Sequence, residues 1–312
     1  MEYTTTIAAN QPIAITIGNF DGVHKGHQRL MHQLRETAQK LNSKPALITF
    51  SPHTLMVVRP DIDIRYLTTL EEKLTLTKDY GQIADYIVIK FTPAVAAMSA
   101  SDFMQNLTTH FFIKGMVIGS NFSLGHNRMG DNTFLQQYGQ EHNILVHPIP
   151  LEEAERTRIS STRIRALVSE GQISEANELL GHPVTLSDIV RHGTQRGKLL
   201  GFPTANLTPE SHKLLPANGV YAVRVSINDP ISDAASSSPV YNGVVNIGVR
   251  PTFDGKERIV EVHLLDVQPD LYDKRITIGF IARLRSEQRF ANIDALKSQI
   301  ANDVQQARQI LM

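Results

Sequence analysis

The chain has 312 residues, which is enough for two domains of ordinary size. Its residues are 41% apolar and 20% charged, and 31 Lys and Arg balance 31 Asp and Glu, so no overall field draws it to nucleic acid or to a membrane surface. Cysteine is absent, which excludes both a disulfide framework and a thiolate metal site.

Targeting signals are not evident in the sequence. The polar N-terminus lacks the basic and apolar regions of a signal peptide, and no apolar run approaches the ~20 residues of a membrane span. We therefore expect a cytoplasmic protein.

Short apolar segments alternate with helical patterns from residue 13 to about residue 150. The strand-like segments begin at Ile13 and continue with Ala46–Phe50, Tyr86–Ile89, Met116–Gly119 and Ile144–His147. Helical spacing follows from about His24 to Asn42, over Leu70–Tyr80 and over Ala100–His110. Alternating strands and helices predict an α/β domain with a parallel sheet, whose ligands bind beyond the carboxyl ends of the strands.

The turn after the first strand is the most informative stretch, with the sequence GNFDGVHKGH. A strand stops, a turn with glycine follows, and a helix opens near His24–His27, which offers free backbone N–H groups and a helix dipole to phosphate. His24 and His27 are three residues apart, so they share a face and can donate hydrogen bonds to phosphate oxygens. The candidate phosphate-binding residues here are Gly18, Asn19, Phe20 and Gly26.

Two other interpretations of the histidines stay open at this point. They could belong to an ordinary helix-capping loop, or they could form a metal pair. The second alternative lacks a carboxylate or cysteine at a recognisable ligand spacing.

Polar clusters also follow later elements of this domain. Asn121 lies in the polar loop Gly119–Gly125 at the end of a predicted strand, although its residue types also suit a plain turn. Ser161 and Thr162 suit a helix N-terminus, with Arg165 one turn further. They predict a second phosphate-binding corner, and the alternative is a capped surface helix.

The pattern changes after a short helix over Ser174–Leu180 that stops at Gly181. We place the domain boundary there, which gives domains 1–182 and 183–312. Turn residues separate the later strand-like segments, which predicts an antiparallel barrel or sandwich. These segments are Val184–Arg191, Val220–Ile227, Val240–Val249, Ile259–Leu265 and Ile276–Leu284. An amphipathic helix from Ile293 to Leu311 ends the chain and is expected to pack on the barrel.

The second domain carries its own candidate site. Gly197 and Lys198 belong to a loop that looks like a phosphate loop but fails the Walker spacing. Thr204 and Asn206, just after a proline, can offer oxygen ligands to Mg²⁺ held by ATP phosphates, although an ordinary turn is the simpler interpretation. Glu261 lies in a predicted strand, where glutamate is disfavoured, so it is either on a solvated face or functional.

These strings resemble a known family. HKGH and ISSTRIR are similar to the HxGH and ISSTxxR motifs of the nucleotidylyltransferase superfamily, and GFPTAN resembles the PTAN signature of riboflavin kinases. Together, in this order, they resemble the bacterial bifunctional riboflavin kinase/FAD synthetase family. The loop at Asn121 is also similar to a family loop near the nucleotide, which implies that Asn121 belongs to the flavin or nucleotide loop, but Leu124 stands where that loop usually has Phe.

The resemblance implies a fold and two activities. It implies an N-terminal Rossmann-like nucleotidylyltransferase domain and a C-terminal antiparallel β-barrel riboflavin kinase domain with a terminal helix. It further implies riboflavin, FMN, FAD and ATP as substrates and products, with Mg²⁺ as the metal. Under it, Glu261 is the general base on the ribityl hydroxyl, Thr204 and Asn206 position magnesium, and His24, His27 and Arg165 act in adenylyl transfer.

Small-molecule substrates are the only partners this implies, without nucleic acid, membrane or an obligatory protein partner. Two alternatives remain at this stage. One is another nucleotidylyltransferase with an appended flavin-binding barrel, and the other is a flavin sensor without catalytic activity.

Overall fold

The computed structural model describes residues 1–150, 159–192, 201–228, 239–252 and 255–312. The chain divides into two compact units, Met1–Ser161 and Thr162–Met312. This division differs from the predicted boundary after residue 182 by two helices, α7 (Ser161–Glu170) and α8 (Ile173–Leu180). Of these, α8 packs on the barrel strands of the second unit. The boundary after residue 182 stays a prediction.

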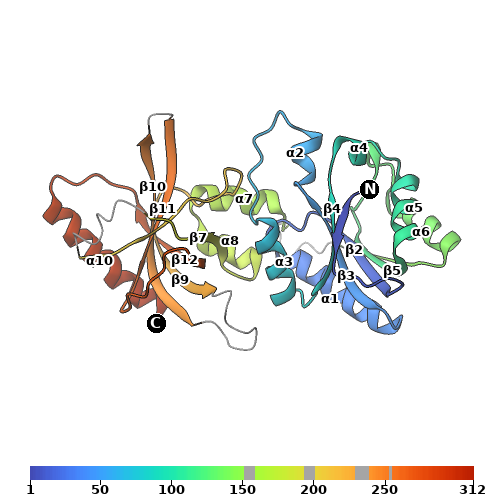
Figure 1. Ribbon diagram of the computed structural model, residues 1–312, viewed down its shortest axis with the longest axis horizontal. Helices are drawn as coiled ribbons and strands as arrows, with labels where there is room; N and C mark the ends of the chain where they lie inside the picture. The colour runs from blue at the N-terminus through green and yellow to red at the C-terminus, as the bar shows by residue number, and fades with distance from the viewer. Residues whose placement is uncertain (151–158, 193–200, 229–238, 253–254) are drawn as a thin grey trace. The chain divides into compact units, whose positions relative to one another are not determined.

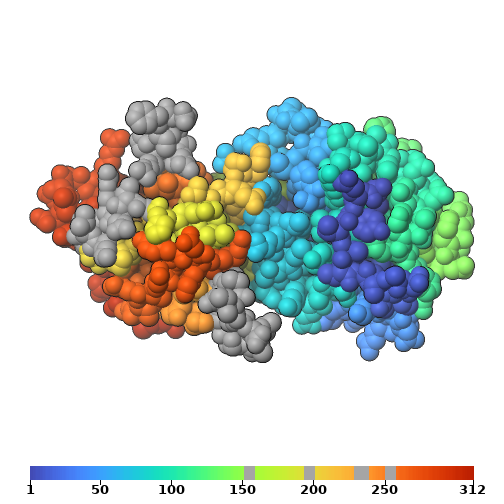
Figure 2. Space-filling model, viewed as in Figure 1, coloured from blue at the N-terminus to red at the C-terminus, as the bar shows by residue number. Residues whose placement is uncertain are grey.

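The first unit contains a six-stranded sheet in the order β1-β4-β3-β2-β5-β6. All neighbours are parallel except β1, which runs antiparallel to β4 at the edge, so the predicted parallel α/β sheet is confirmed. The sequence did not reveal β1, because its three residues carry no apolar pattern; it lies on the surface seen in Figure 2 (dark blue). The strands are β1 (Tyr3–Thr5), β2 (Pro12–Ile17), β3 (Lys44–Ser51), β4 (Asp85–Lys90), β5 (Phe112–Gly119) and β6 (Leu145–Ile149).

Helices cover both faces of this sheet, because alternate residues of each strand point to opposite faces. Ile13 and Ile15 of β2 belong to a core with α5 and α6, whereas Ala14 belongs to a core with α1 and α3. Figure 1 shows α5 and α6 on one side of the sheet and α3 on the other. The helices are α1 (Lys25–Lys40), α2 (Thr54–Val58), α3 (Leu70–Asp79), α4 (Pro93–Ala96), α5 (Ala100–His110) and α6 (Asn132–His142), with a 3₁₀ turn η1 (His126–Arg128).

The strand order locates the ligand-binding edge of this sheet. From β2 the chain moves outward to β3 and β4, and it then crosses back to place β5 on the other side of β2. Open α/β sheets bind ligands where the strand order reverses, at the carboxyl ends of the strands. The turn after β2 carries His24 and His27, and the loop after β5 carries Asn121, so both flank this switch point.

The second unit contains a six-stranded antiparallel sheet in the order β7-β12-β9-β10-β11-β8. It curls until a bridge between Arg191 and Asn206 links its two edges, which confirms the predicted antiparallel barrel. The very short β8 had not been predicted as a strand. The strands are β7 (Val184–Ile189), β8 (Ala205–Leu207), β9 (Gly219–Asn228), β10 (Val240–Thr252), β11 (Gly255–Leu264) and β12 (Arg275–Ser286).

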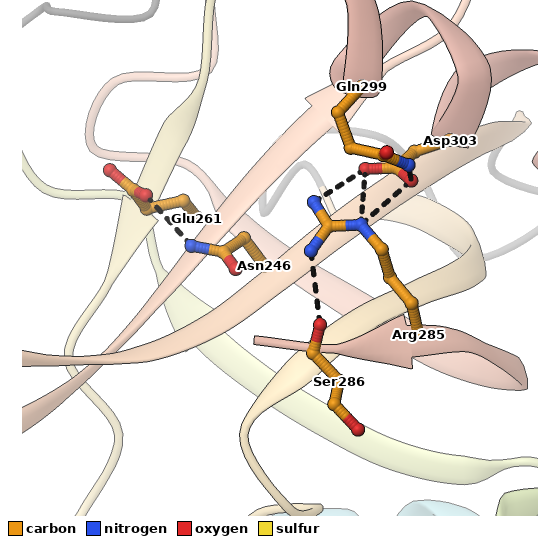
Figure 3. Close-up of polar contacts among 6 residues, drawn as sticks. All are labelled: Asn246, Glu261, Arg285, Ser286, Gln299 and Asp303. Carbon is orange, nitrogen blue, oxygen red and sulfur yellow. Dashed lines mark hydrogen bonds and ion pairs between the residues drawn. The ribbon is translucent and has the colours of Figure 1, made fainter. Parts of the chain in front are cut away.

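The terminal helix α10 (Ile293–Leu311) packs on the outside of the barrel, as predicted. Its Ala307 and Leu311 join Val220 and Val244 in an apolar cluster. A buried ion pair reinforces this contact: Arg285 Nε and Nη2 donate to the carboxylate of Asp303 at 2.9 and 2.8 Å (Figure 3). The Asp303 side chain is only 2% exposed.

Across the described residues, none of the helices combines the length and the apolar character that crossing a membrane requires.

The buried and exposed ion pairs of α10 should differ in their effect on stability. Asp303→Ala leaves the Arg285 guanidinium without its partner, so the free energy of unfolding should fall by about 3 kcal/mol, measured by urea denaturation of the full chain. Arg308→Ala is the matched control on the same helix, because its guanidinium is 54% exposed and pairs with Asp266, and it should cost less than about 1 kcal/mol. Equal losses in the two variants would contradict a dominant role for the buried pair.

Candidate active sites in the two units

The turn between β2 and α1, residues 18–27, has an unusual backbone. Phe20 has φ +49° and Val23 has φ +42°, with Gly22 at φ +82° between them. Glycine adopts such values freely, but a bulky side chain at positive φ costs about 1–3 kcal/mol. Phe20 and Val23 are both buried, at 3% and 0% exposure, so tertiary packing holds the strained conformation.

One side of the turn is held by the carboxylate of Asp21. This side chain is 1% exposed and accepts hydrogen bonds from the backbone N–H groups of Leu67 and Thr68 at 3.1 and 3.0 Å. The hydroxyl of Thr68 adds a bond to the same carboxylate, at 3.2 Å. These donors stabilise the buried carboxylate, which therefore fixes the turn against the segment before α3.

The other side of the turn is held through Asn19. Its amide Nδ2 donates to Thr54 Oγ1 at 2.8 Å, and its backbone carbonyl accepts from Thr49 Oγ1 at 3.2 Å. Ser161 Oγ donates to the carbonyl of Asp21 at 2.8 Å, so Ser161 also contacts the turn. The turn is thus anchored by segments far away in the sequence.

The two imidazoles lie together, as their spacing predicted. Their rings are stacked with centroids 3.6 Å apart and planes 16° from parallel. His24 caps α1, and its Nδ1 accepts from the backbone N–H of His27 at 3.3 Å, so its neutral ring carries the proton on Nε2. Gly26 lets the rings approach, because a Cβ there would lie 3.2 Å from the His24 ring.

His27 is held in its neutral form. Burial lowers its pKa well below the ordinary value, and the neighbouring His24 and Lys73 lower it further. The edge of its ring faces Phe20, with centroids 5.2 Å apart, and its Nδ1 is buried without a hydrogen-bond partner among the described residues. Neutral imidazoles retain one N–H each, so the pair can donate hydrogen bonds to an anionic ligand.

The structure also places other residues that were predicted for adenylyl transfer. Asn121 is exposed beside the switch point, while Leu124 is buried in the core of the first unit at 8% exposure. Gly18, at the start of the turn, donates its backbone N–H to Ile48 O at 3.0 Å. Thr162 and Arg165 lie in α7 of the second unit, and their proximity to the histidines stays a prediction.

In the barrel, three polar residues stand side by side on adjacent strands. Glu261 of β11 is paired with Asn206 of β8 on one side and with Asn246 of β10 on the other. Residues directly opposite each other in an antiparallel sheet point to the same face. Asn246 Nδ2 donates to Glu261 Oε2 at 3.4 Å (Figure 3), so the carboxylate has amide groups in register on both sides.

His263, two residues along β11, holds the loop before β8. Its Nδ1 donates to the carbonyl of Pro203 at 2.8 Å, and its ring packs edge-on against Phe202 with centroids 5.6 Å apart. The GFPTAN segment is therefore attached to the strand that carries Glu261. No role had been predicted for Asn246 or His263, since the strand register that brings them together joins residues far apart in the chain.

The chemistry of Thr204 and Asn206 fits a magnesium ion that arrives with ATP. Both offer neutral oxygen atoms, which Mg²⁺ accepts together with phosphate oxygens and water. Among the described residues there is no group of three or more His, Asp or Glu side chains that could hold a metal ion by itself. Gly197 and Lys198, also predicted to bind phosphate, lie outside the described residues.

Comparisons with known proteins match both halves of the chain. Residues 6–163 match the protein family described as FAD synthetase, and residues 180–311 match the family described as riboflavin kinase. The bifunctional riboflavin kinase/FMN adenylyltransferase of Escherichia coli K12 is 38% identical over 304 residues, covering 97% of this chain and 94% of the relative. The protein of the same name from Pseudomonas fluorescens is 37% identical, covering 94% of this chain and 91% of the relative.

A solved structure has the same overall fold. The crystal structure of a protein named as a macrolide-efflux protein from Streptococcus pneumoniae matches with a TM-score of 0.84 and 28% identity. The match covers 97% of this chain and 96% of that one.

The depressed pKa of His27 predicts a dependence of stability on pH. Below its ordinary pKa of 6.5 the unfolded chain protonates His27 while the folded chain does not, so stability falls as pH drops through this window. His27→Gln should therefore lose less thermal stability than the wild type between about pH 7.5 and about pH 5.5, measured by circular dichroism. The control is His32→Gln, since His32 is exposed on the same helix; an equal change in both variants would contradict the assignment.

Proposed function

The chain belongs to the bifunctional riboflavin kinase/FMN adenylyltransferase family, and we propose which of its residues carry out the two reactions. The enzyme phosphorylates riboflavin to FMN with ATP, and it then adenylylates FMN to FAD with release of pyrophosphate. For the first reaction we assign Glu261 in the barrel, and for the second His24 and His27 at the switch point of the α/β unit. The strongest support is that each matched half contains one of these polar clusters. Glu261 lies in the half that matches riboflavin kinase, and His24 and His27 lie in the half that matches FAD synthetase.

In the kinase reaction, Glu261 takes the proton from the terminal hydroxyl of riboflavin. The hydroxyl oxygen then bonds to the γ-phosphorus of ATP, and the bond between that phosphorus and the bridging oxygen breaks to release ADP. Asn246 donates to one oxygen of the carboxylate, which directs the other toward the hydroxyl. Such a base typically contributes about 10²–10⁴ in rate.

Thr204 and Asn206 would hold the magnesium ion of MgATP. The bound ion neutralises charge on the ATP phosphates. His263 Nδ1 donates to the carbonyl of Pro203 at 2.8 Å, which fixes the segment that carries Thr204 and Asn206. Gly197 and Lys198 remain proposed contacts to phosphate.

In the adenylyl transfer, a phosphate oxygen of FMN attacks the α-phosphorus of a second ATP. The bond between that phosphorus and the oxygen leading to the β-phosphate breaks, and pyrophosphate leaves. His24 and His27 donate hydrogen bonds to the oxygens on which negative charge develops. The backbone of Gly18, Asn19, Phe20 and Gly26 lines the turn, and Asn121 stands at the neighbouring strand end for the flavin or nucleotide.

Ser161, Thr162 and Arg165 are proposed to bind the phosphates that leave. The contact of Ser161 with the turn supports this for the first of them. An arginine near phosphates supplies a charge-assisted, two-pronged hydrogen bond.

The two alternative functions are less well supported. A different nucleotidylyltransferase with an unrelated barrel does not account for the riboflavin kinase match over residues 180–311. A flavin sensor without activity does not account for a glutamate flanked by two amides or for a stacked pair of histidines. We also propose that the enzyme works in the cytoplasm, where its substrate ATP is abundant, and without nucleic acid, a membrane or an obligatory protein partner.

The role of Glu261 predicts a selective loss of kinase activity. Glu261→Gln keeps the size of the side chain but cannot accept the proton, so FMN formation from riboflavin should fall by about 10²–10⁴. Glu178→Gln, on the exposed face of α8, is the matched control and should keep wild-type activity. Product chromatography measures FMN formation by the two variants. If Glu261→Gln formed FMN within a few-fold of the wild-type rate, the role assigned to Glu261 would be wrong.

The role of His27 predicts the opposite selectivity. His27→Ala removes a donor to the phosphate of the adenylyl group that is transferred. FAD formation from supplied FMN should therefore fall by about 10²-fold, while FMN formation from riboflavin is unchanged. His32→Ala, on the exposed side of α1, is the control. Parallel loss of both activities would contradict the division of the two reactions between the two units.

A further inference from the structure

A buried lysine lies behind the adenylyl-transfer site. Lys73, in the second turn of α3, is only 5% exposed, although lysine is almost never fully buried without a partner. Resting on the function proposed for His24 and His27, we propose that Lys73 is a positioning residue for adenylyl transfer. Its ammonium fixes, through Thr49, the turn of residues 18–27 that carries both histidines.

The contact runs through one hydroxyl group. Lys73 Nζ donates to Thr49 Oγ1 at 3.1 Å, and Thr49 donates its own proton to the backbone carbonyl of Asn19 at 3.2 Å. Thr49 is completely buried on β3. Because the ammonium can only donate, it leaves the hydroxyl proton free for Asn19, so the charge on Lys73 sets the direction of both hydrogen bonds.

Asp21 faces the same ammonium from within the turn. Burial lowers the pKa of Lys73 to about 8, and the negative charge of Asp21 acts in the opposite direction. Asp21 in turn accepts three hydrogen bonds from Leu67 and Thr68, just before α3. The start of α3 therefore holds the turn at two points, Asn19 and Asp21.

Packing alone does not account for a lysine at this position. A methionine of similar length would fill the same space without the cost of removing a charge from water. The helix does not require the charge either, because α3 has its own capping box of Thr69 and Glu72. A buried positive charge next to a phosphate site, by contrast, favours the binding of anionic substrates.

The charge also acts on His27. The ammonium of Lys73 is one of the causes that keep the pKa of His27 low, after burial and together with His24. The groups that face this histidine are thus His24 at the start of α1, Lys73 on α3 and, beyond the ammonium, Asp21 in the turn. Removing the positive charge should let His27 accept a proton at higher pH.

The test compares variants in the full-length enzyme. Lys73→Met removes the charge at nearly constant length, and Thr49→Val removes the hydroxyl that joins the ammonium to the turn. Lys78→Met is the matched control, because Lys78 is exposed on the same helix. FAD formation from supplied FMN and FMN formation from riboflavin are measured separately, with circular dichroism as the check of folding.

We expect FAD formation to fall at least about tenfold in Lys73→Met and in Thr49→Val, with FMN formation within about twofold of wild type. Lys78→Met should keep both activities. In the wild type, FAD formation should also decline above the Lys73 pKa of about 8, and this decline should be absent from Lys73→Met. The midpoint of the His27 titration, followed by ¹⁵N NMR, should move to higher pH in Lys73→Met.

Several results would overturn the proposal. FAD formation by Lys73→Met equal to that of Lys78→Met would do so, and so would a loss of activity with an unchanged His27 titration and an unchanged alkaline decline. If Lys73→Met does not fold, Thr49→Val decides, and its wild-type FAD formation would refute the proposal. Failure of the underlying function is distinct, because then His27→Ala would also form FAD at the wild-type rate.

Discussion

The strained turn between β2 and α1 is the constraint on which the first unit depends. Phe20 and Val23 adopt backbone conformations that bulky residues avoid, and the resulting geometry lets the backbone reach His24 at the N-terminus of α1. Buried polar contacts from three distant segments offset the strain: residues 67–68, Thr49 and Ser161. The proposed site for a highly charged substrate is thereby held in place before the substrate arrives, which is what electrostatic catalysis requires.

The barrel builds its site on a different principle. Instead of a turn, it uses strand register, which sets Asn206, Glu261 and Asn246 in one row across three neighbouring strands. Because hydrogen-bonded strands hold their side chains on a regular lattice, the glutamate keeps its orientation without backbone strain. The proposed reactive groups thus lie at the start of a helix in the first unit and on a strand in the second.

The buried ion pair of Arg285 and Asp303 and the buried ammonium of Lys73 have different surroundings. Arg285 and Asp303 form a two-pronged pair that attaches α10 to the barrel, and each group neutralises the other. Lys73 donates to a hydroxyl and faces the negative charge of Asp21, and its own charge helps to lower the pKa of His27. The first arrangement attaches a helix to the barrel, whereas the second is the basis of the positioning role proposed for Lys73.

The sequence by itself predicted most of the strands, the longer helices and the candidate chemistry. Its two periodicities predicted the parallel sheet, the barrel strands and the terminal helix, and the order of turn, HKGH and helix predicted that the two histidines share a face. Only the tertiary structure identified Asn246 beside Glu261, the short strands β1 and β8, and Lys73 behind the turn. The physical reason is that periodicity reports which face of an element is buried, while strand register and buried polar contacts join residues from distant parts of the chain.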